Sequence, residues 1–425
     1  MRVRIRNGRV VDPAHGVDGR LDVYIAGGRI ASLGDAPPGF KADAEIDAGG
    51  AVVCPGLVDL CARVREPGLE HKATMESELR AAAAGGITRL CLPPDTKPAI
   101  DTPAMAHFVH QRAQEVGRCR LHPQGALTRG LKGEALTDMA ALKDAGCIGV
   151  GNGLEAVRDT LVMRRALQYA ATFELTVFLY AQDPWLTGNG CVHEGEISTR
   201  LGLPSIPGAA ETVGVSRELA LIETTGARGH FLHLSNGRAV DLIAKARSDG
   251  LPVTASVTAH HLHLTEHDIG CFNADCHVLP PLRGARDRDR LIAGLRDGTI
   301  SAVCSDHQPH EADAKLAPLG ESEPGISGLD TLLPLTLKLT ERGGLSLTQV
   351  LALLTCNPAR ILGLDTGSLA PGAPADICIF DPDAEYVFDR SRMASRGRNT
   401  PFHGWPLRGR VTHTLVGGRL VYETK

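Results

Sequence analysis

Both ends of the chain carry short runs of alternating apolar and polar residues separated by glycine-rich turns, a pattern typical of β-strands. In the first part of the chain, strands are predicted at 3–5, 9–11, 21–25 and 29–33. In the last part, they are predicted at 375–380, 385–388, 409–416 and 420–422. The middle of the chain has a different pattern, so we predict one β-sandwich made from residues 1–54 and 366–425.

The middle of the chain, residues 55–365, alternates apolar runs with helix-like stretches, which favours parallel βα units. The apolar runs predict strands at 52–60, 87–92, 120–125, 147–150, 176–180, 229–234, 252–257 and 300–305. Helices are predicted between them, at 74–85, 159–171, 211–225, 239–248 and 286–297. Eight strands are the number of a (β/α)8 barrel. The predicted fold is therefore α/β, a TIM barrel with a small composite β-sandwich formed by the terminal segments.

The composition is that of an ordinary globular protein, with 43% hydrophobic and 22% charged residues, which argues against disorder and coiled coil. A net charge of −4 gives no field that would attract nucleic acid or an anionic membrane. No apolar run approaches the ~20 residues that a membrane helix needs, and the N-terminus lacks the apolar segment of a signal peptide. The eleven cysteines include no C-x-x-C pair, so we expect free, mostly buried thiols in a cytoplasmic protein.

Histidines and an aspartate follow the predicted strands, where the active sites of barrel enzymes lie. His233 follows the sixth strand, His260 and His261 follow the seventh, and Asp306 and His310 follow the eighth. Imidazole and carboxylate groups bind Zn²⁺, which activates water for hydrolysis. Any one of these residues, taken alone, is more simply explained by packing or by capping a loop.

Several longer segments together resemble the dihydroorotases of the amidohydrolase superfamily, of the type that partners aspartate transcarbamoylase. They include Arg-Glu-Pro-Gly at 65–68, His-Glu-Gly-Glu at 193–196, Pro-Pro-Leu-Arg at 280–283, Ser-Asp-His at 305–307, Asn-Pro-Ala-Arg at 357–360 and Gly-Arg-Asn-Thr-Pro-Phe at 397–402. The resemblance covers almost the whole chain. It implies an amidohydrolase barrel with a composite β-sandwich, as the pattern of strands also predicts.

The metal-binding motifs of the resembled family are largely missing from this chain. The family motif Asp-x-His-x-His reads Asp-Leu-Cys-Ala-Arg here, with Cys61 and Arg63 at the two histidine positions. The family's bridging aspartate run corresponds to Asn152 and Gly153, and its next histidine to Tyr180. The remaining family ligands are His233 and Asp306, and a catalytic zinc needs about three. We therefore expect no bound metal, with Asp306 as a vestigial general base.

The positions that bind substrate in the resembled family are also changed. Arg65 keeps its place as a carboxylate clamp, and His310 is a vestigial substrate-binding residue beside it. The family's substrate-binding asparagine is Asp95, whose added negative charge should oppose an anionic substrate. At the mouth of the barrel, Arg63 is a permanent cation that should repel a metal and form an ion pair with Asp306.

Three functional hypotheses follow from the resemblance. The first is a non-catalytic dihydroorotase homologue that acts as a structural partner of the aspartate transcarbamoylase catalytic chain, in a hetero-oligomer or, when alone, as a homodimer. The second is an active dihydroorotase or related cyclic-amide hydrolase with a single zinc or a remodelled site, held by Cys61, His233 and Asp306. The third is a sensor that binds carbamoyl aspartate or dihydroorotate without turnover. Metal content separates the first two.

Overall fold

Short apolar strands form a parallel barrel in the computed structural model, which describes residues 1–424. One parallel sheet contains β8 (Leu57–Asp59), β9 (Ile87–Leu92) and β10 (Arg120–Pro123). A second contains β11 (Gly125–Ala126), β12 (Val150–Gly151), β13 (Thr176–Leu179), β16 (Arg228–Phe231), β17 (Val253–Thr258) and β18 (Ala302–Cys304). Because β10 and β11 are consecutive, they join the two sheets. A parallel bridge between Ala62 and His307 brings the first and last barrel positions together, which confirms the predicted TIM barrel.

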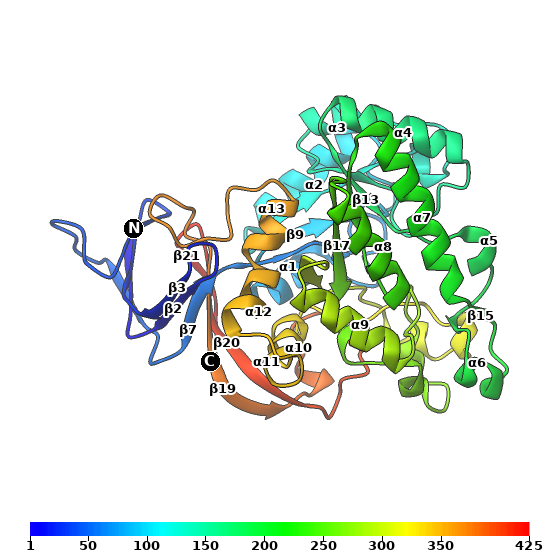
Figure 1. The fold of residues 1–425 in the computed structure, drawn as a ribbon. Coiled ribbons are helices and arrows are strands. Elements are labelled where there is room, and N and C mark those ends of the chain that lie inside the picture. Colours follow the sequence, from blue (N-terminus) through cyan, green and yellow to red (C-terminus); the bar gives the residue numbers. More distant parts are fainter. Residues whose placement is uncertain (425) are drawn as a thin grey trace.

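Helices surround the barrel strands and connect them (Figure 1). Within residues 1–424, the helices of eight or more residues are α1 (Met75–Ala84), α2 (Pro103–Val116), α4 (Thr160–Thr172), α7 (Gly208–Thr225), α8 (Gly237–Ser248), α9 (Ala285–Arg296) and α12 (Leu347–Leu354). Shorter ones are α3 (Met139–Asp144), α5 (Pro184–Thr187), α6 (Glu196–Leu201), α10 (Leu332–Leu337), α11 (Leu339–Arg342) and α13 (Cys356–Ile361). Local signals set their ends: Thr74 caps α1, and Asp159 caps α4.

The two ends of the chain form a β-sandwich beside the barrel (Figure 1). One sheet has the order β5 (Arg29–Leu33), β4 (Val23–Ala26), β1 (Arg2–Arg6) and β6 (Ala44–Asp47). The other has the order β21 (Arg419–Glu423), β20 (Pro406–Val416), β19 (Ile377–Val387), β7 (Val52–Pro55), β2 (Arg9–Asp12) and β3 (Val17–Arg20). Side chains from both sheets, including Val3, Ile5, Val53, Ile377 and Leu415, share one buried core. Segments from the two ends of the chain are therefore neighbours in a single sheet.

The structure differs from the predicted elements in several places. The strand predicted at 52–60 is divided at Gly56, so β7 belongs to the sandwich and β8 to the barrel. A Cβ atom at Gly56 would lie 2.2 Å from a methyl carbon of Thr88, so only glycine fits this crossing. The two strands predicted at 375–380 and 385–388 are one strand, β19, with an irregular register between Asp381 and Glu385. Among the helices of eight or more residues in the described part of the chain, α2 and α12 were not predicted.

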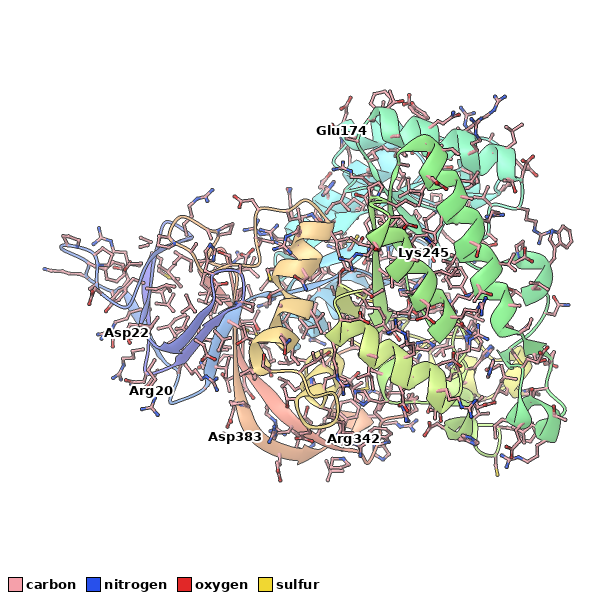
Figure 2. The ribbon with its side chains drawn as sticks, viewed as in Figure 1. Arg20, Asp22, Glu174, Lys245, Arg342 and Asp383 are labelled. Carbon is pink, nitrogen blue, oxygen red and sulfur yellow. The ribbon has the colours of Figure 1, made fainter. Side chains whose placement is uncertain are left out.

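The surface and interior follow the expected division of polar and apolar groups. Charged side chains such as Arg20, Glu174 and Lys245 lie on the outside of the molecule (Figure 2). Ten of the eleven cysteines are buried, as predicted for small core residues, and Cys271 is exposed. Within residues 1–424, no helix combines the length and the apolar character needed to cross a bilayer.

Candidate functional site

The family-equivalent positions converge at the mouth of the barrel, because each follows the carboxyl end of a neighbouring parallel strand. They are Cys61 and Arg63 after β8, Asp95 after β9, Asn152 and Gly153 after β12, Tyr180 after β13, His233 after β16, and Asp306 after β18. His233 and Asp306 have positive φ angles of 53° and 43°. Non-glycine residues rarely adopt this conformation, so the surrounding structure holds both side chains in place.

The guanidinium group of Arg63 occupies the centre of this site and contacts two carboxylates. Its Nη1 lies 2.9 Å from Oδ1 of Asp306, which confirms the predicted ion pair. Its Nε and Nη2 each lie 2.8 Å from Oδ2 of Asp95. The side chains of Arg63 and Asp306 are only 5% and 2% exposed. Burial alone would lower the pKa of Arg63, but the charges of Asp95 and Asp306 outweigh it and raise that pKa.

The contact with Asp95 corrects the expectation that this carboxylate would project a free negative charge toward a substrate. Arg63 neutralises it instead. Gly153 lies against Asp95, since a Cβ atom at Gly153 would be 3.1 Å from the Asp95 Cβ and 3.2 Å from Oδ2. A carboxylate side chain at position 153 would be crowded and repelled by Asp95. The glycine at position 153 therefore leaves the space that Asp95 needs in order to pair with Arg63.

Asn152 and Tyr180 stand where the resembled family has metal ligands, and neither is placed as a metal ligand here. The Asn152 side chain accepts a hydrogen bond from the Thr128 hydroxyl at 2.7 Å and donates to the carbonyl oxygens of Leu131 and Glu155 at 3.1 and 3.0 Å. Through these hydrogen bonds, the Asn152 side-chain amide stabilises the loop that follows β12. Burial raises the pKa of Tyr180, so its phenol stays protonated near neutral pH. Neither side chain supplies the carboxylate or imidazole donor that the resembled family has at its position.

Cys61, His233 and Asp306 provide the donor types that zinc accepts, and their candidate ligand atoms lie within 4.8 Å of one another. Neither ring nitrogen of His233 has a hydrogen-bond partner within residues 1–424. However, Nη1 of Arg63 is 2.9 Å from Oδ1 of Asp306 and 4.0 Å from Sγ of Cys61. Burial also raises the pKa of the Cys61 thiol, despite the opposing effect of Arg63. A dication would meet a fixed cation and a protonated thiol, so these residues do not fit zinc while Arg63 holds its position.

Arg65 and His310, which the sequence predicts as substrate-binding positions, lie beside each other outside this central cluster. Nη2 of Arg65 is 3.1 Å from Nε2 of His310, and Nε of Arg65 donates to the Pro309 carbonyl at 3.1 Å. Burial and the charge of Arg63 lower the pKa of Arg65 to about 10. Burial and the charges of Arg65 and Lys72 lower the pKa of His310 to about 2, so His310 is neutral. The clamp role of Arg65 therefore remains a prediction.

Other histidines at the strand ends support the loops. The ring of His261 contacts the Thr258 hydroxyl at 2.7 Å and the Pro280 carbonyl at 3.2 Å. Nδ1 of His307 accepts a hydrogen bond from the Gly328 amide at 3.0 Å, so the proton of the neutral ring is on Nε2. These contacts agree with the structural interpretation of such histidines.

A buried carboxylate that the sequence reasoning missed, Glu78 on α1, connects the barrel mouth to the C-terminal segment. Its Oε2 accepts from Nε2 of His307 at 2.7 Å and from the Ser395 hydroxyl at 2.6 Å. Its Oε1 accepts from the Ser77 hydroxyl at 2.7 Å and the Arg396 amide at 3.0 Å. The available signal was its helical spacing from Met75 and Ala82, which places Glu78 on the buried face of α1.

Comparisons with known proteins agree with this fold and site. Residues 50–238 match the Dihydro-orotase-like family model, and residues 318–422 match an Amidohydrolase family model. An L-hydantoinase (dihydropyrimidinase) from Arthrobacter aurescens has a similar structure, with a TM-score of 0.88 and 25% identity over 99% of this chain and 96% of that one. A dihydropyrimidinase from Brevibacillus agri has a TM-score of 0.85 and 22% identity over 100% and 95% of the two chains. The fold is therefore an amidohydrolase-type barrel.

Relatives in sequence define the family more narrowly. The chain is 47% identical to a dihydroorotase-like protein of Pseudomonas putida, over 99% of both chains. It is also 47% identical to a dihydroorotase-like protein of Pseudomonas aeruginosa, over 100% of both. A dihydroorotase of Geobacter sp. strain M21 is 42% identical, again over 100% of both. The chain belongs to the dihydroorotase-like family of amidohydrolases.

Proposed function

We propose that this chain is a catalytically inactive dihydroorotase homologue of pyrimidine biosynthesis that serves as a structural subunit of an aspartate transcarbamoylase complex. The observation that supports inactivity most directly is the Arg63 guanidinium, which pairs with Asp95 and Asp306 at the centre of the site. In the family reaction, metal ions lower the pKa of a bound water from 15.7 to about 7. Arg63 brings positive charge to the same place, but a guanidinium has no coordination position for water.

The first test of this proposal is turnover. The purified chain should neither close carbamoyl aspartate nor hydrolyse dihydroorotate above the rate of a protein-free control, with or without added zinc. The protein of Geobacter sp. strain M21 that is named a dihydroorotase, assayed in parallel, serves as the positive control for the reaction conditions. Elemental analysis of the same preparation should find zinc well below one ion per chain. Turnover that disappears on substituting Asp306→Asn would contradict the proposal.

The structural role is supported by the retained fold. The barrel and sandwich persist over the full length shared with the dihydroorotase-like relatives, although the ligand positions of the resembled family have changed. Removal of metal ligands leaves the outer surface of a barrel free to keep an assembly interface. Loss of catalysis and retention of a binding surface are therefore physically compatible in this chain.

The second test is assembly. Co-expressed with the aspartate transcarbamoylase catalytic chain of the same organism, this chain should co-purify in a complex of defined mass and stoichiometry. The substitution Asp306→Asn lies inside the barrel mouth and should leave the complex intact, which makes it a suitable control. Two components that elute separately, each at the mass it has alone, would contradict the structural role while leaving the question of catalysis to the turnover assay.

A second candidate function, a cyclic-amide hydrolase with a single metal, is favoured by one observation. His233 is buried with both ring nitrogens unpartnered in the described part of the chain, and it lies beside Cys61 and Asp306. A histidine in that state is available to a metal if Arg63 moves away. Stoichiometric zinc in protein purified without chelators, lost on substituting His233→Ala, would support this alternative over the first.

A further inference from the structure

A surface cavity of about 540 Å³ lies beside the barrel mouth, and its lining includes neither Arg63 nor Asp306. Its walls come from the loop before α1, the loops after β17 and β18, and the segment between β19 and β20. The cationic residues that line it are Lys72, Lys315, Arg390, Arg396 and Arg398, and the lining also includes His71 and the neutral His310. His310 and Lys72, whose Nδ1 and Nζ atoms are 3.2 Å apart, form the wall nearest to Arg65.

Acidic side chains neutralise only part of the charge in this cavity. Lys72 lies 3.4 Å from a carboxylate oxygen of Glu323, and Arg390 lies 3.2 Å from one of Asp275. Glu311 is the other acidic residue in the cavity lining of the described part of the chain, and a carboxylate oxygen of Glu311 lies 3.9 Å from the His71 ring. No lysine or arginine of residues 1–424 lies within 4.0 Å of the Glu311 carboxylate.

Three of the cavity cations have no carboxylate within 4.0 Å anywhere in residues 1–424. Lys315 donates to the carbonyl oxygens of Ala274 at 3.0 Å, Glu323 at 2.6 Å and His277 at 3.5 Å, which occupies the three N–H groups of its ammonium. Arg396 donates through Nη1 to the Glu70 carbonyl at 3.1 Å. Arg398 donates through Nη1 to the Arg390 carbonyl at 3.1 Å. Each guanidinium therefore keeps N–H groups that can reach a ligand.

This concentration of positive charge is local, because the whole chain has a formal net charge of −4. Cations gathered in one concave site repel one another, and a bound anion relieves that repulsion. Burial lowers the pKa of Lys315 to about 8 even with Asp275 and Glu323 nearby, as expected for an ammonium that lacks a close counter-charge. The cavity is thus prepared for an anion.

The number and type of the unpaired cations indicate a phosphate. A guanidinium group can bind two phosphate oxygens at once through two parallel N–H···O hydrogen bonds. A phosphate monoester carries a charge of about −1.5 to −2 at pH 7, which is more negative than that of one carboxylate. The cavity volume of about 540 Å³ falls in the range of small-molecule sites, so an organic group can accompany the phosphate. Leu316, 79% exposed and part of the cavity lining, offers that group an apolar contact.

We propose that this cavity is a binding site for a phosphate-bearing small molecule, with Arg396 and Arg398 holding the phosphate group and the charge of Lys315 adding to the positive potential of the cavity. The site is separate from the Arg63 cluster and does not depend on the proposed role in assembly. Its ligand would approach from solvent, because Arg396 and Arg398 are exposed side chains.

The test is a calorimetric titration of the purified full-length chain with pyrophosphate at fixed ionic strength. We expect saturable binding at one site per chain. The double substitution Arg396→Gln and Arg398→Gln should weaken it by at least about tenfold, since each removes a charge-assisted contact. Both residues are exposed, so the variant should keep the melting temperature of the wild type within a few degrees, which a thermal scan verifies.

The matched control is Arg392→Gln, in the same segment but outside the cavity, with its side chain 86% exposed. It should leave pyrophosphate binding unchanged. Equal weakening in this control would show a general charge effect and overturn the site. Succinate binding as tightly as pyrophosphate would overturn the assignment to phosphate, and the absence of saturable binding would overturn the proposal as a whole.

Discussion

Replacing Arg63 with alanine is expected to lower the free energy of unfolding by about 3–5 kcal/mol, the range measured when one member of a buried ion pair is removed. Arg63 is the shared partner of Asp95 and Asp306, so its loss leaves two carboxylates close together without a cation. Asp306 would retain a hydrogen bond from the Gln308 amide at 3.1 Å. Urea unfolding of the variant and wild type, compared at the same pH, measures the difference.

A double-mutant cycle separates this ion pair from a general packing effect. The loss caused by Arg63→Ala should be smaller in an Asp306→Asn background, because that background already lacks one of the two charges. A control is Arg9→Ala, which breaks the exposed pair of Arg9 with Asp18 and should cost about 1 kcal/mol or less. If Arg63→Ala costs the same in both backgrounds, the coupling between Arg63 and Asp306 is absent.

Substituting Glu78→Gln should be the other strongly destabilising change, at about 3 kcal/mol. The carboxylate accepts four hydrogen bonds from three separate parts of the chain, and an amide replaces one acceptor oxygen with a donor. Glu76→Gln is the matched control, because Glu76 is exposed in the first turn of the same helix. Its cost should be limited to the helix-dipole effect of about 0.3–1 kcal/mol. Thermal and urea unfolding would measure both variants.

The same substitution should change how stability depends on pH. Burial would raise the pKa of Glu78, but hydrogen bonds from His307, Ser395 and Ser77 outweigh it and lower that pKa below its ordinary value of 4.5. A carboxylate with a lowered pKa stabilises the fold fully above its unfolded-state pKa and loses that contribution as the pH falls through its folded-state pKa. The wild type should therefore lose more stability than Glu78→Gln between pH 5 and the acid limit of folding. Parallel declines would contradict this role.

Much of the barrel could be predicted because its strands are apolar runs of the right length. The pairing of Arg63 with Asp306 was also predictable, since closure of the barrel brings the loops after its first and last strands together. The division of residues 52–60 between the barrel and the sandwich could not be predicted, because it depends on the close approach of Gly56 to Thr88. Gly56 and Thr88 lie in two different strand segments, and the hydrophobic pattern of either segment does not indicate the contact.

The remaining features of the site depend on which atoms a side chain reaches after folding. The bond from Arg63 to Asp95 requires the guanidinium to span the space between the loops after β8 and β9, and no spacing along the chain encodes that reach. By residue type alone, Glu78 could not be distinguished from an ordinary acidic residue of the first turn of an alanine-rich helix. The spacing of Glu78 from Met75 and Ala82 indicates a buried position, but its partners Ser395 and Arg396 lie more than 300 residues further along the chain and could not be predicted.

The position of β7 between β2 and β19 governs the order in which the molecule can be completed during synthesis. The N-terminal strands leave the ribosome first, but β7 gains its second neighbour only after β19, near the end of the chain, has been made. During translation of the barrel, one edge of β7 therefore stays unpaired and available to other nascent chains. Synthesis of β19, rather than completion of the barrel strands, is therefore the step that supplies the second neighbour of β7.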